Sequence, residues 1–320
     1  MNAAQSRKHR TIEALRHALG PLITDALDDP MVKEVMVNPD GKIWIDRMGE
    51  GRIDTGQVMP RSDADSTIRL LADHAGVVVT KDFPLVSANL PLTGERFQGM
   101  FPPIVAGPSF AIRKPAIKVF PLSSYIERDA LSARQAEQLR QAIVDKLNIL
   151  VIGGTGSGKT TFANALLAEP AFADDRLVII EDNRELQCNA PDKVQLLART
   201  IEPVILARDL IFTALRLRPD RIIIGEVRDG AALEMIKVMN TGHPGSICTL
   251  HANSPIDALY RIEDLIGEVS ERIPFRAIGS AIDLIIEIVR TPYGGKVHQI
   301  VKCAEWRDGD YVLDYETFAG

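Results

Sequence analysis

Residues 148–160 read NILVIGGTGSGKT, and the last eight of them fit the pattern G-x-x-x-x-G-K-[ST]. An apolar run precedes the pattern and a helix-forming segment follows it, so we expect a strand at residues 149–152 and a helix at 160–167. The glycines allow the backbone to curl until successive N–H groups point at a phosphate. Lys159 would add positive charge for the β- and γ-phosphates, the hydroxyl of Thr160 would bind Mg²⁺, and the helix would present its first N–H groups to the anion. The sequence therefore predicts a site for a nucleoside triphosphate rather than a glycine-rich turn with a coincidental lysine. The positions expected to bind it are Gly153, Gly154, Thr155, Gly156, Ser157, Gly158, Lys159, Thr160 and Thr161.

Composition limits the classes of protein that this chain can belong to. With 320 residues, of which 46% are apolar, it is long enough for two domains. Its formal charge of −6 and its low aromatic content of 5% lack the features of a nucleic-acid binder, so we expect no stable, specific binding of nucleic acid. The three cysteines are far apart, which fits a reducing cytosol better than disulfides or a zinc site. We find no apolar stretch long enough to span a membrane and no signal-peptide pattern.

The amino-terminal third predicts a small α+β domain over residues 1–115. Apolar residues recur at helical spacing over residues 12–27, which indicates a helix packed on a core or, as an alternative, an amphipathic helix on a membrane surface. Residues 35–37 and 43–45 flank the turn sequence NPDG and predict a hairpin, and a helix follows from Ser62, as its cap, to Gly76. Two arginines, Arg96 and Arg113, lie in the stretch rich in proline and glycine that comes next.

We interpret residues 116–131 as a linker and residues 132–320 as a second domain. Ser132 and Gln135 form a capping box at the start of a helix that should run to Leu147. Short apolar runs then alternate with helical segments, which predicts a parallel sheet with right-handed crossovers. Besides the first strand and helix, the expected strands are 177–180, 222–224 and 246–250, and the expected helices are 203–217, 230–240 and 256–266.

Polar residues after the expected strands are candidates for the site, because ligands of parallel sheets bind at the carboxyl ends of the strands. Glu181 follows the second strand, Glu226 follows the third and His251 ends the fourth. Hydrolysis of a triphosphate needs an acid that anchors the metal and a group that orients water, and either glutamate is suitable. Acidic residues at such positions also cap helices, which remains an alternative for Asp182 and Asp229. A metal site made by His243 and His251 is disfavoured, because no third ligand has suitable spacing.

Five ordered blocks resemble the secretion ATPase superfamily, the motors of type II and type IV secretion, pilus assembly and conjugation. The blocks are residues 153–160, IEDNRE at 180–185, LRLRPD at 215–220, GEVRD at 225–229, and TGHPG to TLHAN over 241–253. The resemblance runs from about residue 30 to 290. Within the superfamily the chain is most similar to the conjugal-transfer ATPases of the TrbB group, since it has a compact amino-terminal domain and no tetracysteine insert.

The resemblance implies a RecA-like P-loop NTPase domain with a mainly parallel sheet. It implies a homohexamer that hydrolyses Mg-ATP, is cytoplasmic and peripherally attached to the inner membrane, and works with inner-membrane components of a secretion channel. Glu181 would belong to an acidic box, Glu226 would be the Walker B acid that binds Mg²⁺, and His251 would report the state of the γ-phosphate. Arg96 and Arg113 would reach the phosphates from the first domain.

Gly225 stands where many P-loop enzymes carry an aspartate, so the choice between Glu226 and Glu181 as the residue that activates water stays open. Two other functions also remain open. One is a RecA-like DNA translocase or helicase, and the other is a scaffold that binds ATP without turnover.

Overall fold

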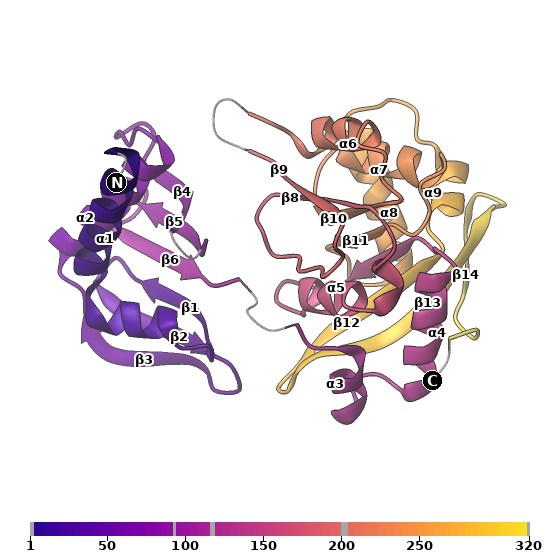
Figure 1. Cartoon of the computed structure of the whole chain (residues 1–320), viewed down its shortest axis with the longest axis horizontal. Coiled ribbons are helices and arrows are strands. Elements are labelled where there is room, and N and C mark those ends of the chain that lie inside the picture. The colour runs from indigo at the N-terminus through magenta and orange to yellow at the C-terminus, as the bar shows by residue number, and fades with distance from the viewer. Residues whose placement is uncertain (1–2, 92–93, 116–118, 200–203, 319–320) are drawn as a thin grey trace. The chain divides into compact units, whose positions relative to one another are not determined.

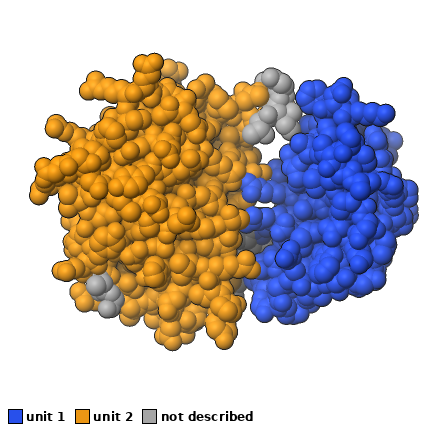
Figure 2. Space-filling model, turned by 180° about the vertical axis from the view of Figure 1, so that it is seen from behind, with its two compact units in different colours: residues 1–117 blue, residues 118–320 orange. Residues whose placement is uncertain are grey.

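The computed structural model describes residues 3–91, 94–115, 119–199 and 204–318. The chain divides into two compact units, residues 1–117 and 118–320 (Figure 2). Within the described ranges, no helix combines the length and the apolar character needed to cross a bilayer.

The first unit is a six-stranded antiparallel sheet with two helices packed on it (Figure 1). The strand order is β3-β2-β1-β6-β5-β4. The expected hairpin is confirmed, because β1 and β2 pair across the turn at residues 38–41. The elements are α1 Ala3–Asp28, β1 Val32–Val37, β2 Lys42–Arg47, β3 Gly51–Val58, α2 Arg61–Ala75, β4 Leu85–Asn89, β5 Arg96–Met100 and β6 Ser109–Arg113.

Both helices of this unit bury the face that the sequence pattern predicts. Leu15, Leu19 and Ile23 of α1 are buried in the core, so the packed-helix interpretation is the correct one for that face. Gly76 ends α2 in the left-handed conformation, as expected. The cap assigned to Ser62 is wrong: the N-cap residue is Pro60, two residues earlier, and no side chain caps α2.

The second unit is an eight-stranded mixed sheet in the order β14-β13-β12-β7-β11-β10-β8-β9. The pairings from β12 through β9 are parallel, whereas β13 and β14 add antiparallel strands at one edge. The strands are β7 Ile149–Ile152, β8 Leu177–Glu181, β9 Lys193–Leu197, β10 Arg221–Val227, β11 Ile247–Leu250, β12 Leu284–Thr291, β13 Gly294–Arg307 and β14 Asp310–Asp314. The predicted α/β class is thus confirmed, but the sheet is mixed.

Helices cover both faces of this sheet and bury two separate cores (Figure 1). Alternate residues of β7 show the division, since Val151 packs with α3, α4 and α5, and Leu150 packs with α6 to α9. The helices are α3 Leu122–Glu127, α4 Ala133–Val144, α5 Lys159–Leu167, α6 Ala207–Leu215, α7 Ala231–Met239, α8 Pro255–Gly267 and α9 Phe275–Ala281.

Several predicted boundaries shift. The capping box of Ser132 and Gln135 is present, but α4 ends at Val144 rather than Leu147. Helix α6 is shorter than the expected segment 203–217, of which residue 203 lies outside the described ranges. Helix α3 lies inside the segment interpreted as a linker, and it belongs to the second unit.

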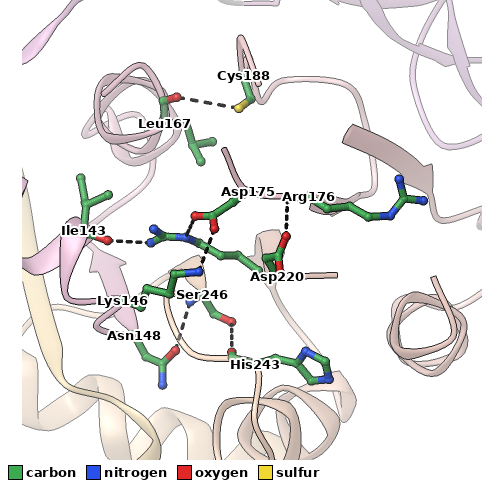
Figure 3. A network of polar contacts seen from close by, with 11 residues as sticks. Ile143, Lys146, Asn148, Leu167, Asp175, Arg176, Cys188, Asp220, His243 and Ser246 are labelled. Carbon is green, nitrogen blue, oxygen red and sulfur yellow. Dashed lines mark hydrogen bonds and ion pairs between the residues drawn. The ribbon is translucent and has the colours of Figure 1, made fainter. Parts of the chain in front are cut away.

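Buried charges join the amino ends of the parallel strands (Figure 3). Arg221 is 2% exposed, donates to Asp175 Oδ2 at 2.6 Å and to the carbonyl of Ile143 at 2.8 Å, and lies 4.6 Å from the ring centroid of Phe172. Lys146 donates to the other carboxylate oxygen of Asp175 at 2.7 Å. Burial opposes ionisation of Asp175, but the two hydrogen bonds outweigh it and lower its pKa. Each charge in this network therefore has a partner, which is the condition for burying it.

Candidate nucleotide site

Four segments singled out from the sequence meet at the carboxyl edge of the parallel strands. Ile152, the last residue of β7, pairs with Leu250, the last residue of β11, and Leu250 pairs with Val227 at the end of β10. Strand β8 ends at Glu181, beside β10. The loop at residues 153–158, Glu181, Glu226 and His251 therefore share one edge of the sheet. We expected Glu226 to follow its strand, but it lies within β10, which extends to Val227.

The loop at residues 153–158 has a conformation that requires glycine at several positions. Gly153, Gly156 and Gly158 have φ values of 149°, 71° and 99°. A Cβ atom on Gly153 would lie 2.2 Å from the carbonyl oxygen of Ile288 in β12. The loop thus runs directly against the neighbouring strand, and Gly158 stands at the N-cap of α5.

Lys159 lies across this loop with its ammonium group largely buried. Its Nζ donates to the carbonyls of Gly153 at 3.0 Å and Gly154 at 3.1 Å, and it lies 3.1 Å from Nδ1 of His251. Because an ammonium group can only donate, Nδ1 accepts and the imidazole proton is on Nε2. Burial and the positive charge of Lys159 lower the pKa of His251, which favours this neutral form.

The Nε2 atom of His251 faces Glu226 at 2.8 Å from Oε1. This close contact does not meet the geometry of a hydrogen bond, so the buried Oε1 accepts no hydrogen bond. Arg228 donates to the other oxygen of Glu226 and lies 3.4 Å from Asp182 Oδ2, so it links the ends of β10 and β8. A row of polar contacts therefore runs from the cationic Lys159 through the imidazole of His251 to the anionic Glu226 and the cationic Arg228.

Glu181 has a different environment. Its Oε1 accepts the backbone N–H groups of Glu185 at 2.8 Å and Leu186 at 2.6 Å, so this oxygen holds the loop that follows β8. Burial raises the pKa of Glu181 against the effect of these bonds. Asn164 of α5 holds the same loop by donating to the carbonyl of Glu185 at 3.0 Å and accepting from Gln187 N at 2.8 Å.

Unpartnered buried atoms gather at this edge. Within the described part of the second unit, four buried side-chain polar atoms have no hydrogen-bond partner. Three of them belong to Ser157, Glu181 and Glu226, and the fourth belongs to Gln138. A buried polar group without a partner costs about 1–3 kcal/mol, so such a concentration is typical of a binding site.

Arg96 and Arg113 belong to the first unit, where the structure makes them neighbours. They are directly opposite each other in the antiparallel pair of β5 and β6, and Arg113 is also opposite Glu34 of β1. Two guanidinium groups with side chains on one face form a concentrated positive charge.

The structure separates the two histidines that we considered as a metal pair. His251 follows the carboxyl end of β11, while His243 precedes its amino end and contacts the carbonyl of Pro219. No group of three potential metal ligands among His, Cys, Asp and Glu exists in the described ranges. The structure therefore gives no support to a histidine metal site.

Sequence reasoning missed three residues of this edge. Arg228 was inside a quoted block, and it lies one residue beyond the end of β10, where its guanidinium group reaches Glu226 and Asp182. Arg290, at the end of β12, has an exposed guanidinium group 3.7 Å from the position of a Cβ on Gly156. Asn164, a buried amide one turn into α5, carried no signal beyond its polarity among apolar neighbours.

Fold and site together define an α/β protein with a glycine-rich loop and acidic side chains at the carboxyl edge of its sheet. The chain matches the family model described as "Type II/IV secretion system protein" over residues 17–303, and it belongs to this family. It is 43% identical to the conjugal transfer protein TrbB of Rhizobium radiobacter over 97% of this chain and 96% of that protein. It is 31% identical to VirB11 of the same organism, over 85% of this chain and 89% of that protein.

Solved structures agree on the fold. The match to the solved structure of the ATPase DotB from Legionella pneumophila covers 88% of this chain and 81% of DotB. The TM-score is 0.64 at 16% sequence identity. The expected membership of the secretion superfamily, with the TrbB proteins as similar relatives, is thereby confirmed.

Proposed function

We propose that this chain is an ATPase that drives conjugal transfer or another type IV secretion process by hydrolysing Mg-ATP, and that its second unit is a RecA-like P-loop domain. One observation carries the proposal. Lys159 and the three unpartnered buried oxygens of Ser157, Glu181 and Glu226 belong to one edge of the sheet, next to a glycine loop. This set offers a cation and backbone N–H groups to phosphates and leaves acidic oxygens free for a metal ion and water.

The loop at residues 153–158 and the first turn of α5 would bind the triphosphate. Lys159 would exchange the carbonyls of Gly153 and Gly154 for phosphate oxygens, which are stronger acceptors because they are charged. Thr155, Thr160 and Thr161 lie in the same segment with their side chains at least partly exposed, so their hydroxyls are accessible to the ligand.

Glu226 and Thr160 fit a magnesium ion, because hydroxyl and carboxylate oxygens are its preferred ligands and Glu226 Oε1 has no donor. When bound, Mg²⁺ would supply positive charge that offsets the charge of the transition state. Glu226 also suits the orientation of water. Glu181 suits that role less well, since one of its oxygens already holds the loop after β8.

His251 would detect the γ-phosphate through its contact with Lys159. In the structure the imidazole contacts the ammonium group on one side and faces Glu226 on the other, so movement of Lys159 toward phosphates would release the ring. Arg96 and Arg113 would supply positive charge from the first unit, which we propose spans residues 1–115. We propose residues 116–131 as the connection between the units, of which α3 packs in the core of the second.

Relatives support the remaining parts of the proposal. The TrbB and VirB11 proteins are named for conjugal transfer and type IV secretion. We therefore propose a cytoplasmic homohexamer that attaches peripherally to the inner membrane and engages inner-membrane components of a secretion channel.

Steady-state phosphate release tests the proposal against its alternatives. The protein should release phosphate from ATP only when Mg²⁺ is present, at a rate that single-stranded DNA does not raise. Strong stimulation by DNA would indicate a translocase. Tight binding of ATP without any release would indicate a scaffold.

A further inference from the structure

The glycine loop is supported from outside by the hairpin of β12 and β13. A Cβ on Gly295 would lie 2.5 Å from the carbonyl oxygen of Ser157, and a Cβ on Gly158 would lie 3.5 Å from Cα of Gly295. Backbone meets backbone here, without side chains between the two. The position of the hairpin end therefore sets the space that residues 157–158 occupy.

Arg128, the C-cap residue of α3, fixes this hairpin end. Its Nη1 donates to the carbonyl of Tyr293 at 3.0 Å and its Nη2 donates to the carbonyl of Gly295 at 2.8 Å. Gly294 lies between them at a φ of 109°, and a Cβ there would be 2.7 Å from Nη1. The two bonds use the planar fork of a guanidinium group, which a lysine cannot reproduce.

The same helix also packs on α5, the helix that follows the loop. The guanidinium carbon of Arg128 lies 4.2 Å from the ring centroid of Tyr125, and this buried ring packs edge-on against Phe162 of α5 at 5.1 Å. Phe162 is in the first turn of the helix that begins with Lys159. After α3, the carbonyl of Ala130 accepts from Val297 N at 2.9 Å. The segment 122–130 thus contacts both the hairpin that packs against residues 157–158 and the helix that follows the glycine loop.

We propose that Arg128 is a positioning residue for the nucleotide loop: it never touches the nucleotide, but it holds residues 293–295 against Ser157 and Gly158 and so preorganises the loop. This inference rests on the proposed function of that loop. If the loop adopts its binding conformation for only a fraction of the time, its affinity for the nucleotide falls in proportion to that fraction. Loss of Arg128 should therefore weaken nucleotide binding more than it slows the chemical step.

The test compares Arg128→Gln and Arg128→Lys with Arg134→Gln, an exposed arginine of α4 in the same unit. Arg128→Gln should raise the KM for ATP about tenfold, the loss expected from one or two partly hydrated charge-assisted hydrogen bonds, while kcat falls less than about threefold. Arg128→Lys should fall between Arg128→Gln and the wild type, and Arg134→Gln should equal the wild type. An unchanged KM in Arg128→Gln, or an equal rise in Arg134→Gln, overturns the proposal.

Hydrogen exchange separates this inference from the proposed function. In the protein without nucleotide, Arg128→Gln should speed amide exchange at residues 157–158 and 294–297 at an unchanged melting temperature. This readout holds even if the protein proves to have no ATPase activity, in which case only the proposed function fails. Wild-type exchange at these amides overturns the positioning role, and Arg128→Lys provides the same measurement if Arg128→Gln does not fold.

Discussion

Replacing Asp175 by alanine should destabilise the second unit by about 3 kcal/mol. Removing one partner of a buried ion pair costs about 3–5 kcal/mol, because the remaining charge is left without compensation. Arg221 is that charge here, and it is 2% exposed. We expect the lower end of the range, since Arg221 keeps its bond to the carbonyl of Ile143 and Lys146 is 38% exposed and can be hydrated.

Urea unfolding followed by tryptophan fluorescence measures this loss. Each unit contains one tryptophan, Trp44 in the first and Trp306 in the second, so a Trp44→Phe background makes the signal specific for the second unit. The melting temperature should fall by about 6–12 °C for a unit of this size. Asp192→Ala is the matched control, because Asp192 also pairs with an arginine, Arg176, but is 58% exposed. It should cost less than about 1 kcal/mol.

The effect of pH follows from the lowered pKa of Asp175. A carboxylate with a depressed pKa in the folded state contributes its full stabilisation above its unfolded pKa of about 3.9 and loses it as the pH falls through the lower folded value. The difference between the wild type and Asp175→Ala should therefore be the same at pH 7 and pH 5. A loss equal to that of Asp192→Ala, or a difference that shrinks between pH 7 and pH 5, would refute the reasoning.

Three further predictions concern the nucleotide site. Glu226→Gln should keep ATP affinity but slow turnover by about 100-fold or more, because it removes the carboxylate and preserves the shape of the side chain. If Glu226→Gln turns over normally and Glu181→Gln is slow, Glu181 rather than Glu226 is the residue that orients water. Arg96→Lys and Arg113→Lys should each lower phosphate release while circular dichroism and oligomer size stay unchanged, since lysine lacks the bidentate fork; wild-type rates in both variants would make them ordinary surface charges. Single-stranded DNA should bind weakly and with a strong dependence on salt in fluorescence anisotropy, given the net charge of −6, and a salt-resistant complex would contradict this.

Local signals in the sequence were sufficient for the elements around the site. Strand β7 has the predicted bounds, and the capping box of α4 is present, because both depend on residues adjacent in the chain. Ser62 failed as a cap because Pro60 already fixes the backbone before α2 and the helix starts at Arg61. Adjacent residues thus specify an element better than they specify its first residue.

The antiparallel edge of the second sheet was not predicted. Strand β12 joins the parallel strands through β7, about 135 residues earlier in the chain, and β13 and β14 then fold back on it. No local pattern specifies such pairing partners. The omission mattered for function, because β12 and β13 carry the hairpin that contacts residues 153 and 157–158.

The candidate site shows the same division between local and distant information. The strand ends correctly placed Glu181, Glu226 and His251 at one edge, since the carboxyl ends of parallel strands meet there. The contact between Lys159 and His251 joins residues 92 positions apart, and the use of Glu181 Oε1 by the following loop depends on how that loop folds. Such details require the packed structure.

Phosphate release by the Lys159→Ala variant tests the central claim most directly. The wild type should hydrolyse Mg-ATP, and Lys159→Ala should lose at least about 100-fold of that rate, because the loop loses the ammonium group that would bind the transferring phosphate. Lys237→Ala, which removes an ammonium group that contacts Glu234 in α7, should keep the wild-type rate. Turnover by Lys159→Ala within about threefold of the wild type would contradict the assignment of this loop as the site of ATP hydrolysis.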